Sequence, residues 1–336
     1  MKNLALSVLD LAPVKQGKTI KNTFEDSLDL ARHTENLGYK RYWLAEHHNM
    51  ASIASSATSV LIGYIAGGTE KIRVGSGGVM LPNHSSLVIA EQFGTLENLY
   101  PNRIDLGVGR APGTDGLTAK ALGRNPMTIN EQFPRQIREL QQYFSEENSE
   151  SPVRAIPGEG SDIPIYILGS STDSAWLAAE MGLPYAFAGH FAPEMLEMAF
   201  KIYHDHYRPS EKFPEPYTIA CVNGIAADTD EEAHFLATTL YQAFLNIARN
   251  DRKPFSGPTE NMDALWSPAE KVGILQKLRY SFIGSEATVA ENIRFFQERF
   301  MVNEIMLTSH IHDHEKRKKS YEIIRDSIIS KDRFPQ

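Results

Sequence analysis

A carboxylate and two imidazoles stand together at Glu46, His47 and His48, directly after the apolar segment 42–45 (YWLA). These groups exchange protons near neutral pH, so the triplet is a candidate for acid–base catalysis or for polarising a ligand. It could also bind a metal ion, as in a metal-dependent hydrolase. Because successive strand side chains point to opposite faces, His47 and His48 cannot share one ion while the strand continues. A purely structural histidine pair is the third interpretation.

Two further segments could hold an anion. Arg110 lies between glycines in segment 107–113 (GVGRAPG), and its guanidinium could bind a phosphate or form an ordinary surface ion pair. Gly169, Ser170 and Ser171 open a predicted helix that also carries Ser174. Free backbone N–H groups, hydroxyls and the helix dipole favour a phosphate there, although a plain helix N-cap has the same sequence.

Glycines are dense at Gly77 and Gly78, within segment 75–78 (GSGG) at the end of a predicted strand. Glycine allows close approach of a ligand to the backbone, or it relieves crowding inside a sheet. His310, His312 and His314 alternate after the last predicted strand, and we expect them at the surface because the segment enters a polar helix.

The elements that must position these residues alternate regularly along the chain. Eight strands alternating with helices favour a parallel (β/α)8 barrel of the α/β class, formed by residues 1–336 as one domain. An open doubly wound sheet is the alternative, but no GxGxxG motif follows the first strand. The predicted strands are 4–9, 40–46, 71–80, 103–108, 163–168, 184–188, 217–226 and 304–308. The predicted helices are 22–37, 54–67, 85–99, 129–144, 171–181, 193–206, 229–249, 286–300 and 314–329.

Segment 250–284 interrupts the alternation with prolines and glycines and contains Trp266 and Phe282. Irregular segments of this length in compact domains are often lids or binding loops. We therefore expect an insertion that covers the end of the barrel.

The composition excludes several classes of protein. The 336 residues carry a net charge of −8, which argues against a nucleic-acid partner. No run is long enough to span a membrane, and the start of the chain lacks the pattern of a signal peptide. The single cysteine, Cys221, fits a reducing cytoplasm and lies in an apolar run typical of the core. The basic run 316–319 (KRKK) is predicted to be a solvated helical face.

Four segments together resemble the bacterial-luciferase-like flavin monooxygenases, in matching order and spacing over nearly the whole chain. They are 42–48 (YWLAEHH), 73–82 (RVGSGGVMLP), 101–110 (PNRIDLGVGR) and 168–171 (LGSS). The resemblance implies a barrel that binds reduced FMN, received from a separate flavin reductase, and uses O2 to oxygenate a small organic substrate such as an aldehyde. The resemblance further implies that the flavin carries out the reaction with O2, while the protein positions the reactants and controls protons.

The resemblance also implies roles for individual residues. His47 matches the catalytic histidine of the family, beside Glu46 and His48. Gly77 and Gly78 match a position where the family often has a non-proline cis peptide beside the flavin. The phosphate-holding positions match Arg110, Gly169, Ser170, Ser171 and Ser174, and segment 250–284 matches the mobile lid.

Two departures from the light-emitting members argue against bioluminescence. Gly109 replaces a cysteine beside the flavin, and Ser170 replaces a glutamate in the phosphate turn. A deazaflavin-dependent dehydrogenase on the same barrel and a flavin-binding protein without turnover stay open. Family members commonly pair, so we expect a homodimer through the small-residue segments 54–57, Gly63 and 67–68.

Overall fold

The computed structural model describes residues 4–124 and 129–329. Eight of its parallel strands follow one another in the order β6-β5-β4-β3-β2-β1-β9-β7, and the pairing of β6 with β7 closes them into a barrel. The predicted (β/α)8 barrel is therefore confirmed. The barrel strands are β1 (Ala5–Asp10), β2 (Arg41–Leu44), β3 (Arg73–Met80), β4 (Ile104–Gly109), β5 (Ile165–Gly169), β6 (Tyr185–Phe187), β7 (Thr218–Ala226) and β9 (Glu304–Thr308).

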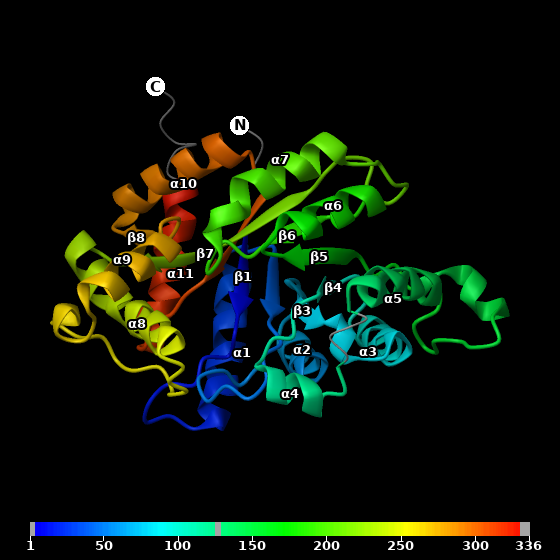
Figure 1. Ribbon diagram of the computed structural model, residues 1–336, viewed down its shortest axis with the longest axis horizontal. Helices are drawn as coiled ribbons and strands as arrows, with labels where there is room; N and C mark the ends of the chain where they lie inside the picture. Colours follow the sequence, from blue (N-terminus) through cyan, green and yellow to red (C-terminus); the bar gives the residue numbers. More distant parts are fainter. Residues whose placement is uncertain (1–3, 125–128, 330–336) are drawn as a thin grey trace.

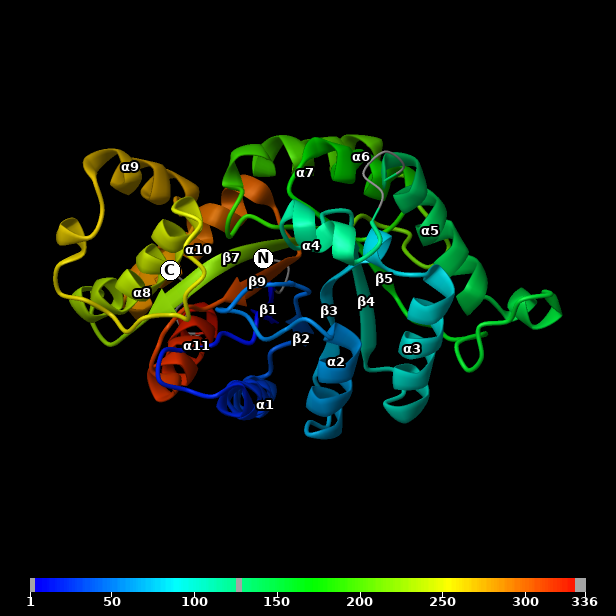
Figure 2. The same cartoon turned by 60° about the horizontal axis from the view of Figure 1, so that its bottom comes forward.

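Helices surround the barrel, as Figures 1 and 2 show. Several end where the sequence predicts: Gly182, in the left-handed conformation at φ 63°, closes α6. The helices are α1 (Ile20–Asn36), α2 (Thr58–Gly67), α3 (Ser86–Leu99), α4 (Gly116–Ala121), α5 (Ile129–Phe144), α6 (Thr172–Met181), α7 (Leu196–His206), α8 (Asp230–Ala248), α9 (Pro268–Lys277), α10 (Glu286–Phe300) and α11 (His314–Ile329).

The barrel strands are apolar on both faces because one face lines the interior and the other packs against helices. Every residue of β7 is buried, for example. The interior cluster includes Trp43, Tyr166, Ile219 and Cys221, so the predicted core position of the cysteine is confirmed.

A buried ionic network crosses the barrel at the amino-terminal ends of the strands. The Arg41 guanidinium lies 2.8 Å from the Asp105 carboxylate and 2.9 Å from that of Glu304. It also donates to the Tyr166 hydroxyl at 2.7 Å. These charges are desolvated but mutually compensated. They fill this end of the barrel, so the opposite end is where a ligand can enter.

The segment 250–284 is more regular than the sequence predicts. It contains α9 and the short strand β8 (Phe282–Gly284), which pairs with the end of β7. Trp266 packs with residues of α8 and α9 in a small core of its own. These two helices lie on the side of the molecule away from α5 (Figure 1). The helix α4 was also not predicted. Among the described residues, no helix has the length and apolar character needed to cross a membrane.

Candidate active site

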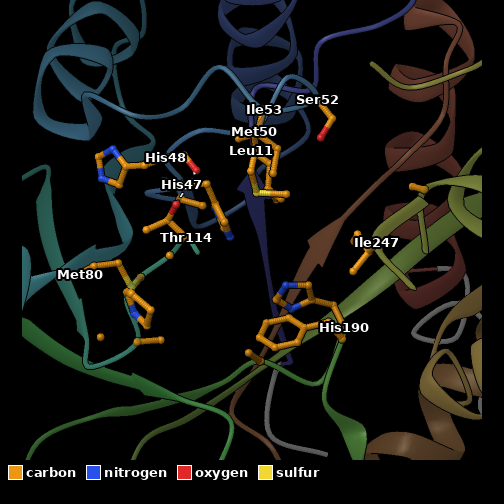
Figure 3. A pocket seen from close by; sticks show the side chains of 18 of the residues that line it. Leu11, His47, His48, Met50, Ser52, Ile53, Met80, Thr114, His190 and Ile247 are labelled. Atoms are coloured by element: carbon orange, nitrogen blue, oxygen red, sulfur yellow. Dashed lines mark hydrogen bonds between the residues drawn. The ribbon is translucent and has the colours of Figure 1, made fainter. Parts of the chain in front are cut away.

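A cavity of about 800 Å³ opens at the carboxyl-terminal ends of the barrel strands. Its wall combines the segments after β2, β4, β5 and β6 with the end of α8 and residues 250–255. Figure 3 shows His47 and Met80 on one side and His190 and Ile247 on the other. Function in a barrel of this kind gathers at this end, so the cavity is the candidate active site.

Most of the predicted site residues lie on this wall. Glu46 and Gly78 do not line it, although both are adjacent to residues that do. The predicted residues that line the cavity are His47, His48, Gly77, Arg110, Gly169, Ser170, Ser171 and Ser174.

Glu46 is an anchored carboxylate behind the wall, 1% exposed. His84 Nε2 lies 2.9 and 3.0 Å from its two oxygens, and His48 Nε2 lies 2.9 Å from Oε1. The Met80 N–H and the Asn83 amide also donate to it, at 2.9 and 3.1 Å. Burial opposes ionisation, but these hydrogen bonds hold the pKa of Glu46 at about 2. Glu46 therefore ties the end of β3 to the segment after β2.

His47 has a different environment from its neighbour His48. Its backbone N–H donates to the Ser55 carbonyl at 3.0 Å, and its Nδ1 is buried without a hydrogen bond to any described residue. Burial lowers the pKa of His47 to about 4, with Glu46 opposing and His48 adding to this effect. The imidazole is consequently neutral at pH 7, and its Nε2 is the nitrogen left to meet a ligand.

The three side chains do not converge as ligands of one metal ion. Glu46 and His48 bond to each other, and His47 faces the cavity. In residues 4–124 and 129–329, the group with metal-ligand spacing is Asp29, His314 and Glu315, which lies elsewhere. Lys318 already pairs with Asp29 and Glu315, at 3.0 and 2.9 Å.

The turn after β5 forms a concave backbone site. Ser171 precedes the first turn of α6, and the Ser174 hydroxyl donates to the Ser171 carbonyl at 2.7 Å. The same hydroxyl lies 2.9 Å from the Tyr185 hydroxyl. A Cβ at Gly169 would overlap the Ser174 side chain, so glycine is required for this close approach. The turn thus presents N–H groups and hydroxyls to the cavity, which suits an anion.

Arg110, directly after β4, brings a positive charge to the same cavity wall. Its guanidinium lies 3.4 Å from the Asp173 carboxylate, and its side chain is 38% exposed. Arg124 donates to the Arg110 carbonyl and, at 2.9 Å, to Asn83. The backbone of Arg110 is therefore held in place, while its charge stays near the Gly169–Ser171 turn.

Of the glycine pair in β3, Gly77 lines the cavity. The peptide bond between Gly77 and Gly78 is cis, as the family resemblance implies. A Cβ at Gly77 would come within 2.7 Å of Leu9 and 3.1 Å of Trp43. Any larger residue at position 77 would therefore collide with Leu9 and Trp43.

Two histidines of the wall were not predicted as site residues. His190 follows β6, and His310 follows β9, where the sequence suggested surface histidines. For His310 that expectation is wrong, because the residue turns back into the cavity before α11 begins. Only the rule that strand ends carry function could have selected them, since neither belongs to a motif.

Residues 250–255 form a strap across the cavity mouth. Arg252 donates to the Asp115 carboxylate at 2.9 Å and to the Asn49 carbonyl at 3.2 Å. At the other end of the strap, the Phe255 N–H donates to Val14 and its carbonyl accepts from Gln16, at 2.8 and 2.9 Å. Only this part of the expected lid borders the cavity, while Trp266 and Phe282 lie in packed cores.

A closed (β/α)8 barrel with a largely apolar cavity at its strand ends is the architecture of an α/β-barrel enzyme. The sequence model of the luciferase-like monooxygenases matches residues 4–302, and the chain belongs to this family of oxygen-incorporating oxidoreductases. It is 54% identical to the Bacillus subtilis protein YvbT and 49% identical to a luciferase-like monooxygenase of Escherichia coli. Each alignment covers 97% of this chain and 97% of the relative. It is 33% identical to the N-acetyl-S-alkylcysteine monooxygenase of Bacillus subtilis, over 97% of this chain and 99% of the other.

Solved structures agree with this assignment. The structure of apo-MsnO8 has a TM-score of 0.89 and 31% identity, over 97% of this chain and 99% of the other. The oxygenating constituent of 3,6-diketocamphane monooxygenase of Pseudomonas putida, solved with FMN, has a TM-score of 0.73 at 18% identity, over 98% of each chain. An F420-dependent secondary alcohol dehydrogenase has a TM-score of 0.69 at 14% identity, over 97% and 100%. The last two likenesses concern the fold alone.

Proposed function

We propose that the chain is a two-component monooxygenase that binds reduced FMN and uses O2 to oxygenate a small organic substrate. The observation that carries the proposal is the anion site of Gly169, Ser170, Ser171 and Ser174, which shares one apolar cavity with the neutral imidazole of His47. A flavin mononucleotide combines a phosphate with an apolar ring system, which these two features suit. When bound, the reduced flavin would supply the electrons that activate O2.

The residues of the cavity then have distinct tasks. The Gly169–Ser171 turn and the Ser174 hydroxyl bind the phosphate, and Arg110 offsets its charge. His47 holds or moves a proton at Nε2, since its neutral form at pH 7 can accept as well as donate. Glu46 acts as a positioning residue that fixes Met80 and His48. The 250–255 strap excludes water from the mouth.

Anaerobic titration tests the cofactor. Reduced FMN is expected to bind more tightly than reduced riboflavin, which lacks the phosphate, and more tightly than the reduced deazaflavin F420. Replacing Arg110 by Met should reduce the ratio of the FMN affinity to the riboflavin affinity about tenfold, because one charge-assisted hydrogen bond to the phosphate is lost. Preference for F420 would contradict the FMN proposal and favour a dehydrogenase. Stoichiometric zinc or manganese in the purified protein would favour the hydrolase alternative instead.

The substrate screen should contain aldehydes, ketones and thioethers. Thioethers are included in the screen because the 33% identical Bacillus subtilis relative is named N-acetyl-S-alkylcysteine monooxygenase. Oxygenated product formed only in the presence of reduced FMN would support turnover. Flavin binding without any product, unchanged by replacing His47 with Ala, would support a binding protein instead.

The proposed partners are a flavin reductase, as transient donor in the cytoplasm, and a second copy of the chain. Val60 and Tyr64 are exposed on one face of α2. Val88 and Leu99 are exposed on one face of α3, since they are eleven residues, or three helical turns, apart. The two helices pack together, with the Tyr100 hydroxyl donating to the Gly63 carbonyl at 3.1 Å. An apolar surface of this kind suits an isologous dimer. Sedimentation of a monomer at micromolar concentration would contradict it.

A further inference from the structure

A second pair of histidines faces the same cavity as His47. His190 follows β6 and His310 follows β9, so they reach the cavity from the part of the barrel wall remote from β3 and β4. Figure 3 shows His190 across the cavity from His47 and Met80. The flavin proposal uses neither residue, which leaves two imidazoles whose purpose is unassigned.

Hydrogen bonds anchor the backbone at both histidines. The Asn223 amide donates to the His190 carbonyl at 2.8 Å, and the Arg317 guanidinium donates to the Ser309 carbonyl, next to His310, at 3.1 Å. Aromatic rings flank them: Phe191 lies 4.8 Å from the His190 ring and Phe255 lies 5.1 Å from that of His310, centroid to centroid. Side chains fixed in this way are suited to orienting a ligand.

The protonation of the pair follows from its surroundings. In each ring Nδ1 is buried and makes no hydrogen bond to any residue in 4–124 or 129–329. A buried N–H without an acceptor is rarer than an unsatisfied acceptor, which favours the tautomer with its proton on Nε2. Burial, His310 and His47 lower the pKa of His190 to about 3. Burial and Arg317, opposed by Asp10, lower the pKa of His310 to about 4. Each ring therefore offers one neutral N–H donor.

The cations nearest to the pair are already neutralised by carboxylates. The neighbouring wall is apolar, with Leu11, Met50, Ile53, Ile247 and Phe255. The two cations of the strap already have partners: Arg252 lies 2.9 Å from the Asp115 carboxylate, and Lys253 lies 2.5 Å from that of Asp251. A carboxylate or sulfonate entering here would lose its hydration without gaining a free cation.

We propose that His190 and His310 bind the oxygen of a neutral, mainly apolar substrate through their Nε2 atoms and select against carboxylates and sulfonates. The inference rests on the proposed function in one respect: the Gly169–Ser171 end of the cavity is assigned to the cofactor, which leaves this end for the substrate. The binding preference itself is measurable without any flavin chemistry.

Isothermal titration of the full chain, free and saturated with FMN, tests the proposal with 2-octanone and octanoate. These probes share a chain length and differ in charge. The ketone is expected to bind at least tenfold more tightly than the carboxylate. Replacing His190 or His310 with Leu should weaken ketone binding about tenfold. Gln at either position, which can place an N–H near the Nε2 position, should restore binding to within about threefold. His234, exposed on α8, provides the matched control.

Equal affinity for octanoate and the ketone, or no ketone binding by the wild-type chain, overturns the proposal without need of a variant. Leu variants that bind the ketone as the wild type does also overturn it. FMN affinity should be unchanged in all variants. Failure to bind FMN while the ketone preference persists would contradict the proposed function and leave this inference standing.

Discussion

Asp10 and Arg317 form an ion pair that joins the first strand of the barrel to its last helix. Arg317 Nη2 lies 2.9 Å from Asp10 Oδ1, and the two side chains are 1% and 0% exposed. The Tyr42 hydroxyl and the Ala12 N–H also donate to the carboxylate, at 2.5 and 3.1 Å. Burial alone would raise the pKa of Asp10, but Arg317 and the hydrogen bonds bring it below its ordinary value. Arg317 also donates to the carbonyl of Ser309 at 3.1 Å, so the pair supports the backbone next to His310 in the cavity wall.

Replacing Arg317 with Met should destabilise the protein by about 3–5 kcal/mol, because it leaves the Asp10 carboxylate buried without a cation. The neighbouring Lys316 is the matched control, since its pair with Glu232 lies at the surface. Lys316→Met should cost less than about 1 kcal/mol. Urea denaturation of both variants measures the free energies of unfolding. Similar small losses in the two variants would contradict a structural role for the buried pair.

The basic run 316–319 shows where sequence reasoning reaches its limit. The three lysines pair with acidic residues at the surface, as predicted. For Arg317 the prediction of a solvated side chain is wrong, because its guanidinium is buried against Asp10. Charge patterning identifies a polar helix, and it cannot tell which single charge has a buried partner more than 300 residues away. Asp10 gave no signal of its own at the end of an apolar strand.

The fold was more predictable than the site. Alternating apolar strands and amphipathic helices predicted all eight barrel strands, because that periodicity is local. The grouping of Gly169, Ser170, Ser171 and Ser174 at one wall of the cavity was also predictable, since they belong to one continuous turn and the helix that follows it. His190 and His310 were not found, because they meet only when β6 and β9 take their places in the closed barrel. The helix α9 was missed because it contains Pro268, which is tolerated at its first position, and Gly273, which lies exposed inside it.

Replacing Glu46 with Gln should destabilise the protein by about 2 kcal/mol. The amide keeps the shape of the side chain but loses the charge, and its NH2 group would face the Met80 N–H donor. Glu260→Gln, at an exposed position, serves as the control and should leave stability unchanged. Thermal unfolding measures both. If Glu46→Gln unfolds like the wild type yet abolishes turnover, Glu46 takes part in chemistry rather than in positioning.

Stability should fall as the pH drops below neutrality. Burial holds the pKa values of His47, His190 and His310 at about 4, 3 and 4, below the ordinary 6.5. The unfolded chain therefore takes up these protons first, so the stability is fully present above pH 6.5 and is lost as the pH falls toward 4. Each histidine contributes a slope of about 1.4 kcal/mol per pH unit.

Urea denaturation between pH 7 and pH 4.5 measures this slope. Replacing His190 with Leu should reduce the slope by about 1.4 kcal/mol per pH unit, since one proton is removed from the linkage. The replacement His234→Leu, at an exposed position of α8, controls for the His-to-Leu change itself. An unchanged slope in His190→Leu would show that His190 is not the buried neutral imidazole described above.

Replacing Gly169 with Ala should weaken FMN binding at least tenfold and leave riboflavin binding nearly unchanged. The new Cβ would overlap the Ser174 side chain and displace its hydroxyl from Tyr185 and from the anion site. Only the phosphate of FMN depends on that turn, so riboflavin reports on the rest of the cavity. Gly273 in α9, where a Cβ meets nothing within 4 Å, gives the control Gly273→Ala. Equal weakening of both flavins would mean that the turn supports the cavity as a whole and does not bind the phosphate.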